Sequence, residues 1–217
     1  MRTILTTVGI SLLQNAKRHH GLSRGESPSD QQLSNYLRHE DAKEVSAETN
    51  ALHRLGLQSD DRIVFLHSAT QKSAVCADFL SRHYAESVDS ISTREIQDLS
   101  YEEGKFKLRG LRSLVGTLTE LIEEAQGEGR EVLINATGGF KAEIAFATLV
   151  GLLFDVPVYY IHERFRDIVE MPVLPIDWDY TILYNHRDLF EWIILENPAI
   201  DEVDQRLKGR PDKLRSL

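Results

Sequence analysis

Short apolar runs rich in β-branched residues recur along the chain, and segments with helical spacing lie between most of them. The runs cover residues 3–8, 62–67, 88–91, 131–136 and 156–161. Strands that alternate with helices are typical of βαβ units. Continuous apolar character within a run is typical of parallel strands that are covered on both faces. The pattern therefore predicts an α/β protein with a Rossmann-like, doubly wound, mainly parallel sheet and helices on both faces.

The segments between these runs carry helix signals. Residues 29–55 predict one or two helices, with Ser27 as the candidate N-cap, Pro28 in the first turn and Gly56 as the C-terminal stop. Further helices are expected over residues 70–84, 108–127 and 188–195. Residues 140–154 are apolar almost all round, so we expect this helix to be buried on more than one side. It lies either deep in the domain or at a subunit interface, and we favour the interface.

The end of the chain has a different pattern. Residues 166–173 predict one more strand, and prolines and aromatic residues follow it. We expect one domain over residues 1–175. Residues 176–217 are expected to form a helical C-terminal extension or a linker to an effector domain. The sequence ends inside a helical pattern without a C-cap glycine, so we expect it to be part of a longer protein.

Composition narrows the class of partner. The 217 residues include 25 Lys and Arg against 34 Asp and Glu, a net charge of −9. An excess of acid argues against binding along a nucleic acid duplex, but one local cluster of donors is enough for a small anion. The single cysteine and the absence of a signal-peptide pattern predict a cytoplasmic protein. The longest apolar stretch is about half of the roughly 20 residues that span a bilayer, so no membrane segment is expected.

Polar segments that follow the predicted strands are the first place to look for a site, because ligands of open parallel sheets bind beyond the carboxyl ends of the strands. These segments are residues 6–11, 67–72, 135–141 and 162–164. The strongest is Thr137-Gly138-Gly139, which leads into a helix next to Lys141. Glycines allow close backbone approach, and a helix start offers free N–H groups to an anion. The alternative is an ordinary tight turn with Gly139 near the N-cap.

Other chemistry has less support. The chain has neither the G-x-G-x-x-G fingerprint nor a P-loop, and its histidines form no H-E-x-x-H motif, so no metal is expected. Cys76 lies on an apolar helix face and is expected in the core. Arg62 and His67 have the R-x-x-x-x-H spacing of HEPN nucleases, but they bracket a strand, and we interpret the spacing as a coincidence. His67 is either a ligand contact or a half-buried histidine.

Three segments in order carry a family resemblance. They are ILTTVGISLLQN (4–15), LHSAT (66–70) and INATGGFKA (134–142). Together they resemble the CARF domains of type III CRISPR ancillary proteins, over about residues 1–175. The resemblance implies a homodimer with a Rossmann-like sheet. It also implies a sensor of cyclic oligoadenylates, made by the CRISPR polymerase during phage infection, that signals to an effector domain, often a ribonuclease.

The resemblance also implies a ligand and a set of contacts. Cyclic tetra-adenylate is the first expectation, because its internal two-fold symmetry matches that of a homodimer. Matched onto this chain, the loops after the first and fourth strands hold phosphate and ribose, and the other segments line the adenines. The expected ligand-binding residues are Gly9, Ile10, Ser11, Ala69, Thr70, Gln71, Thr93, Asn135, Thr137, Gly138, Gly139, Phe140 and Lys141. No cofactor is expected.

Three function classes remain open. The first and favoured one is a ligand sensor whose effector lies elsewhere. The second is a self-limiting ring nuclease, in which a ribose 2′-hydroxyl attacks the adjacent phosphate without a metal and Ser11 and Lys141 are the catalytic residues. The third is a nucleotide-dependent metabolic enzyme on the same fold, against which the absent nucleotide fingerprints count.

Overall fold

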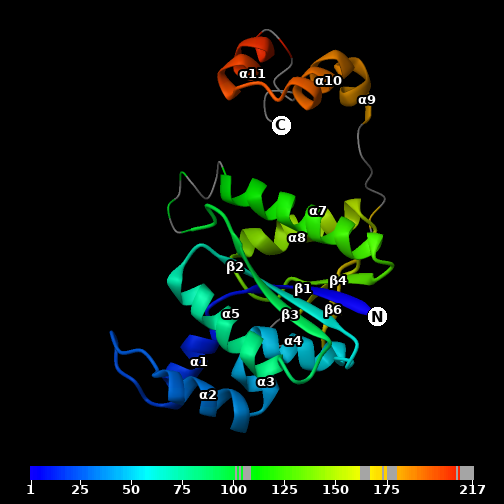
Figure 1. Cartoon of the computed structure of the whole chain (residues 1–217). Helices are drawn as coiled ribbons and strands as arrows, with labels where there is room; N and C mark the ends of the chain where they lie inside the picture. The colour runs from blue at the N-terminus through cyan, green and yellow to red at the C-terminus, as the bar shows by residue number, and fades with distance from the viewer. Residues whose placement is uncertain are drawn as a thin grey trace. The chain divides into compact units, whose positions relative to one another are not determined.

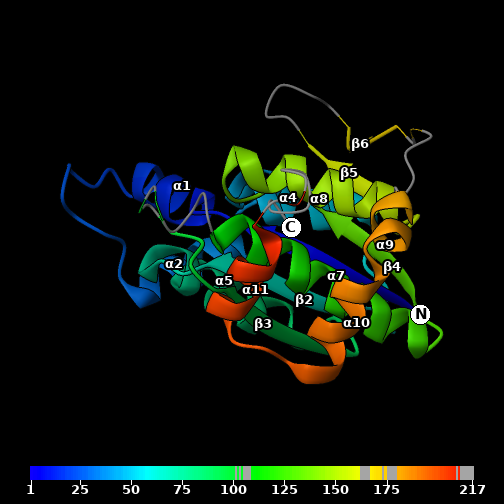
Figure 2. The ribbon, with the colours of Figure 1, turned by 90° about the horizontal axis from the view of Figure 1, so that it is seen from above.

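The computed structural model describes residues 1–100, 102, 104, 109–161, 167–172, 174, 180–208 and 210. The chain divides into two compact units, Met1–Leu174 and Pro175–Leu217. Among the described residues, the first unit forms a six-stranded sheet with the strand order β3-β2-β1-β4-β5-β6. β3 and β6 lie at opposite edges of this sheet (Figure 2).

The strands are parallel except for the last. They are β1 (Arg2–Val8), β2 (Arg62–Ser68), β3 (Ser90–Ile96), β4 (Glu131–Asn135), β5 (Val158–Tyr160) and β6 (Val169–Glu170), and β6 runs antiparallel to β5. The strand predicted over residues 88–91 is displaced. Residues 92–95 of β3 are exposed at the sheet edge, so their polar character hides the strand from a hydrophobic pattern. Of the strand predicted over 166–173, the structure shows β6, and residues 166 and 173 lie outside the described residues.

Helices cover both faces of the sheet (Figure 1). One face carries α1 (Ser11–His19), α2 (Asp30–His39), α3 (Ala42–Val45), α4 (Ala47–Leu55) and α5 (Gln71–Tyr84). The other carries α7 (Leu111–Gly127) and α8 (Lys141–Leu153), which contact each other. Each layer has its own apolar core, one against Ile4 and Phe65 and the other against Leu5 and Ile134. The predicted Rossmann-like, doubly wound fold is therefore confirmed.

Residues 29–55 form more helices than the sequence predicts. They make the separate helices α2, α3 and α4, because Ser46 is extended (φ −156°, ψ 167°) and caps the next helix. The predicted N-cap Ser27 is wrong. Ser29 caps α2, and its hydroxyl and backbone N–H exchange hydrogen bonds with Gln32. Gly56 ends α4 at φ 62°, as predicted.

The apolar helix predicted over residues 140–154 is α8, and its own chain does not enclose it. Ala147, Val150 and Gly151 are buried in the core beside the sheet. Leu149, on the same helix, is 45% exposed. Of the two locations that the sequence leaves open for this helix, deep burial within the domain is therefore wrong for the single chain.

The second unit is small and helical in its described part. It contains α9 (Tyr180–Asn185), α10 (Arg187–Glu196) and α11 (Ile200–Leu207). α10 confirms the helix predicted over 188–195, and it ends at Asn197 in the left-handed region at φ 44°. Residues 209 and 211–217 lie outside the described residues. Within the described parts of the chain, no helix is both long enough and apolar enough to cross a membrane.

Buried charges tie the amino-terminal ends of the strands together. Asp61 is fully buried, and the Arg2 guanidinium donates to both of its carboxylate oxygens at 2.9 and 2.6 Å. Arg130, also buried, donates to the Arg2 carbonyl at 2.9 Å. Burial by itself would raise the pKa of Asp61, but hydrogen bonds from Arg2 and from the Gln58 N–H outweigh it and lower the pKa. The pair therefore stabilises the fold at neutral pH, and this contribution is lost as the pH falls through the lowered pKa of Asp61.

We predict that Asp61→Asn lowers the free energy of unfolding by about 3 kcal/mol, because it leaves Arg2 without its buried partner. Urea denaturation at pH 7 measures the loss. Asp60→Asn is the matched control, since Asp60 is 46% exposed and its pair with the N-terminus is open to water. Equal losses in the two variants would contradict a role for burial.

Candidate functional site

The candidate site lies where the direction of the sheet connections reverses. β1 and β4 are neighbours, but the helices that follow them lie on opposite faces, α1 on one and α8 on the other. Beyond the carboxyl ends of β1, β2 and β4 the structure forms a crevice of 60 Å³, lined by Val8, Gly9, Ile10, Ser68, Thr70, Ser73, Gly139 and Phe140. A water takes up about 30 Å³ of the liquid, so this space holds about two waters. This crevice alone does not enclose a nucleotide.

Direct backbone contact between two loops forms the floor of this crevice. A Cβ on Gly9 would lie 2.7 Å from the backbone nitrogen of Gly139, and one on Gly138 would lie 2.6 Å from the Thr7 carbonyl oxygen. The Thr7 hydroxyl donates to the Gly138 carbonyl at 2.7 Å. Gly139 has φ 93°, which favours glycine. The glycines after β1 and β4 are therefore required for the loops to approach each other.

A buried carboxylate that the sequence analysis missed accepts hydrogen bonds from the loop after β1. Glu48, 1% exposed, lies in the first turn of α4. It accepts hydrogen bonds from the Gly9 N–H at 2.8 Å and from the Ser11 hydroxyl at 2.9 Å. The Ser11 oxygen in turn accepts from the Ala47 N–H at 3.0 Å. The sequence gives no signal for Glu48, because an acid in a first helical turn is usual on a protein surface.

A second buried carboxylate lies at the start of α8. Glu143, also 1% exposed, accepts from the Phe140 N–H at 2.9 Å. Burial raises its pKa to about 7, the hydrogen bond from Phe140 opposes this shift, and the negative charge of Glu48 adds to it. A Cβ on Gly138 would collide with Glu48, and one on Gly139 would collide with Glu143. Two carboxylates therefore flank the glycine pair, which the sequence analysis did not foresee.

Most of the sequence-predicted residues lie in these loops, but several have structural partners. The Thr137 hydroxyl donates to the Asn135 side chain at 2.7 Å and accepts from the Ile161 N–H at 3.2 Å. Asn135 is fully buried, and its Nδ2 has no hydrogen-bond acceptor among the described residues. Thr70 is the N-cap of α5 and follows Ala69. These side chains therefore stabilise the loops through contacts within the protein.

Besides Gly139 in the crevice lining, three predicted residues are exposed, in two different settings. Lys141 and Gln71 are the first residues of α8 and α5, and both face solvent. Within the described part of the chain, the Lys141 ammonium has no hydrogen bond or ion pair. Thr93 lies in the middle of β3, three residues before the strand ends at Ile96, so the structure does not bring it to the crevice.

Burial and side-chain partners decide between the alternatives for the other candidate residues. His67 is buried, and its Nδ1–H donates to the Ser68 carbonyl at 3.0 Å. Of its two alternatives, it therefore matches the half-buried histidine rather than the ligand contact. Arg62 starts the same strand and pairs with Glu128 at 2.8 Å, so it does not meet His67. Cys76 is buried, and burial together with the Glu48 charge raises its pKa to about 12, which confirms a core role. The predicted segment 162–164 lies outside the described residues.

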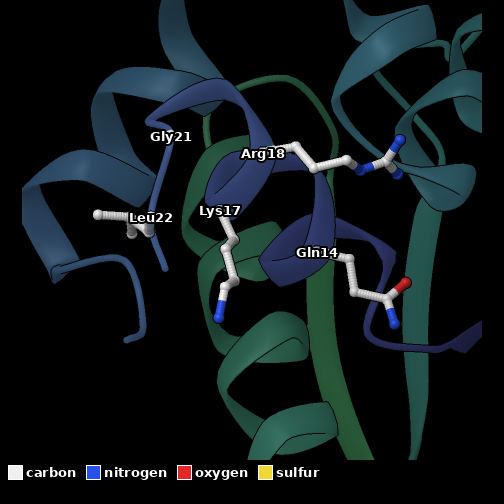
Figure 3. A pocket seen from close by; sticks show the side chains of 5 residues that line it. All are labelled: Gln14, Lys17, Arg18, Gly21 and Leu22. Atoms are coloured by element: carbon white, nitrogen blue, oxygen red, sulfur yellow. The ribbon is translucent and has the colours of Figure 1, made fainter. Parts of the chain in front are cut away.

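A larger pocket of 590 Å³ follows α1 and is lined by Gln14, Lys17, Arg18, Gly21 and Leu22. Figure 3 shows the Lys17 and Arg18 side chains leaving the helix in different directions. Lys17 donates to the Glu26 carbonyl at 2.9 Å and Arg18 to the Asn15 side chain at 2.7 Å. Because these cations make local contacts and do not converge, we assign no function to this pocket.

The raised pKa of Glu143 predicts a pH-dependent stability. Between the ordinary value of 4.5 and about 7 the folded chain holds a proton that the unfolded chain has lost, so the free energy of unfolding falls as pH rises through this window, by on the order of 3 kcal/mol. Glu143→Gln should match the wild type at pH 5 and be more stable at pH 8. Thermal melting across this range measures it, with the exposed Glu123→Gln on α7 as the control. If the change in stability between pH 5 and pH 8 is as large in Glu143→Gln as in the wild type, the assignment of this pH dependence to Glu143 is contradicted.

Comparison with known proteins identifies the family. The model of the family described as "CRISPR-associated protein (Cas_APE2256)" matches residues 43–174. Among solved structures, the chain is similar to Can2 from Sulfobacillus thermosulfidooxidans in complex with cyclic tetra-adenylate, with 11% sequence identity, a TM-score of 0.43, and coverage of 95% of this chain and 56% of that one. The chain thus spans little more than half the length of Can2. Because the family model covers more than half of the chain, the protein belongs to the Cas_APE2256 family of CRISPR-associated proteins.

Proposed function

We propose that residues 1–174 form a sensor domain that binds a cyclic oligoadenylate across the carboxyl edge of the sheet. The observation that carries the proposal is the segment Thr137–Lys141 at the reversal between β1 and β4, which places an ammonium without a partner among the described residues at the start of α8. Membership of a CRISPR-associated family supports the biological setting. The resemblance of the three loop segments to CARF domains supports the ligand class.

The chemistry of the α8 start suits a phosphate. The N–H groups of Lys141 and Ala142, the first two positions of α8, have no acceptor within the helix. The helix dipole and the Lys141 ammonium both favour an anion at this end. The Phe140 N–H is not available, because it donates to Glu143. A phosphate therefore meets the helix at Lys141, on the solvent side of the glycine pair.

The small size of the crevice supports a site made by two copies. A ring of four nucleotides cannot enter a space of 60 Å³, so it lies over the loops and exposes its other half. A second chain related by a two-fold axis offers the same loops to that half. The exposed Leu149 side of α8 supplies an apolar surface for this contact. We therefore propose a homodimer with one cyclic tetra-adenylate across its axis.

Binding is better supported than cleavage or metabolic catalysis. The Ser11 hydroxyl already donates to Glu48 and accepts from Ala47, so it is not free to donate to a reacting phosphate. A metabolic enzyme encloses its substrate in a concave pocket, and the crevice at the strand ends is too small for one. Mass spectrometry of cyclic tetra-adenylate after incubation with the protein distinguishes a sensor from a ring nuclease, since a sensor leaves the ring intact.

We predict that Lys141→Ala weakens the binding of cyclic tetra-adenylate by about 2 kcal/mol, or about thirtyfold, because it removes a charge-assisted contact at a helix start. Isothermal titration calorimetry measures the dissociation constant. Lys43→Ala, at an exposed position of α3, is the control and should bind as the wild type does. A wild-type chain that binds no cyclic oligoadenylate of any size would contradict the proposed function.

We predict that the chain is a dimer at micromolar concentration and that Leu149→Asp shifts it toward the monomer, because a charge at a buried contact is costly. Light scattering after size-exclusion chromatography gives both masses. A monomeric wild type would contradict the shared site.

A further inference from the structure

We propose that Glu143 couples ligand binding to the uptake of a proton: the buried carboxyl group behind the start of α8 gains a proton from water when a phosphate of the cyclic oligoadenylate binds at Lys141. The inference rests on the proposed function and on the contacts of Glu143 in this structure. It makes Glu143 a positioning residue, which acts on the ligand without touching it.

Glu143 lies behind the loop that leads into α8. Its side chain is 1% exposed, and its Oε1 accepts from the Phe140 N–H at 2.9 Å. Its other oxygen, Oε2, packs so closely against Gly139 that a Cβ there would collide with it. No hydrogen-bond donor reaches Oε2 among the described residues, and Glu143 does not line the crevice at the strand ends. A ligand over the loops is therefore affected by the charge of Glu143 and not by contact with it.

The two buried acids beside the glycine pair differ in how many donors they have. Both oxygens of Glu48 accept hydrogen bonds, from the Gly9 N–H at 2.8 Å and from the Ser11 hydroxyl at 2.9 Å. Glu143 has one donor among the described residues. A buried carboxylate is costly unless hydrogen bonds or an opposite charge satisfy it. An added negative charge is therefore expected to protonate Glu143 before Glu48.

The charges around Glu143 also favour the protonated form. Within the part of the chain that the structure describes, no cation forms an ion pair with it. Burial raises its pKa to about 7, the hydrogen bond from Phe140 opposes the shift, and the charge of Glu48 on α4 adds to it. From α5, Cys76 and Tyr84 face Glu48 and stay neutral, because burial raises the pKa of both. At neutral pH Glu143 therefore populates both of its forms, and a small change in its surroundings shifts the balance.

A phosphate at the start of α8 is close enough to cause such a shift. Glu143 holds the Phe140 N–H, and the proposed phosphate binds the N–H of the next residue, Lys141. These two nitrogens are no farther apart than neighbouring Cα atoms, about 3.8 Å. With a hydrogen bond of about 2.9 Å at each, the two acceptor oxygens are at most about 10 Å apart. The Debye length in physiological salt is about 8 Å and buried charges are screened less, so the phosphate raises the pKa of Glu143.

The sign of the effect follows from linkage. Protonated Glu143 favours the bound state, so the affinity is constant at pH values below about 7, where the free protein already holds the proton. It falls as the pH rises above this value. We expect the wild type to bind cyclic tetra-adenylate about tenfold or more weakly at pH 8.5 than at pH 6, because a ring in the proposed dimer lies near two such acids. The phosphodiesters of the ring stay ionised across this range, so the ligand takes up no proton itself.

Calorimetry on the full chain measures both the affinity and the proton. At pH 7.5, titrations of cyclic tetra-adenylate in PIPES and in Tris buffer should give different heats, with an uptake on the order of half a proton per chain. In Glu143→Gln the uptake should vanish, and the affinities at pH 6 and pH 8.5 should agree within about twofold. Two control variants should keep the wild-type uptake. Glu123→Gln removes an exposed acid from α7, and His67→Gln removes the titratable side chain near the end of β2.

The outcomes separate the inference from the function on which it rests. Equal heats in the two buffers for the wild type, or an uptake that persists in Glu143→Gln, would overturn the role of Glu143 and leave the sensor function intact. A loss of affinity by the same factor at both pH values, with the uptake retained, would mean a structural role only and would also overturn it. Glu143→Met, a side chain of similar length without an acid, tests the same loss if Glu143→Gln does not fold. A wild type that binds no ring at either pH would overturn the proposed function itself.

Discussion

Backbone contact between the loops after β1 and β4 is the constraint on which the rest of the candidate site depends. Gly9 and Gly138 leave no room for a side chain where the two loops meet. Two buried acids, Glu48 and Glu143, lie on either side of this contact. Because the floor is closed, the edge of the sheet presents a shallow surface, and a large flat ligand suits it better than a small enclosed one.

The opposite end of the sheet shows how this site is kept in register. Arg2, Asp61 and Arg130 fix the amino-terminal ends of β1 and β2 through buried hydrogen bonds. β1 pairs with both β2 and β4 along its length. The carboxyl ends of the three strands therefore end at defined positions, and the loops that follow them meet at one place. Paired charges are placed where only stability is needed, while carboxylates without cationic partners among the described residues lie under the loops.

The sequence predicts the sheet and the location of the site, because both follow from periodicity and from the rule for parallel strands. It places β3 too early, over residues 88–91, since the exposed polar residues of this edge strand have no apolar pattern. Thr93, which the resemblance implies as a ligand contact, lies in the middle of this strand. The sequence also does not predict Glu48 or Glu143. Acids in the first turn of a helix are ordinary at the surface, and only tertiary packing buries these two. The glycines after β1 and β4 indicate from the sequence that the backbone can closely approach a ligand. In the structure they instead allow the two loops to approach each other.

The most direct test of the central claim is the stoichiometry with which the chain binds cyclic tetra-adenylate. The half-site at each loop pair and the two-fold symmetry of the ring predict one ring for every two chains. Calorimetric titration of a protein of known mass in solution measures this ratio, and about 0.5 ring per chain is the expected value. One ring per chain, or no binding to a ring of any size, would contradict a shared site at the carboxyl edge of the sheet.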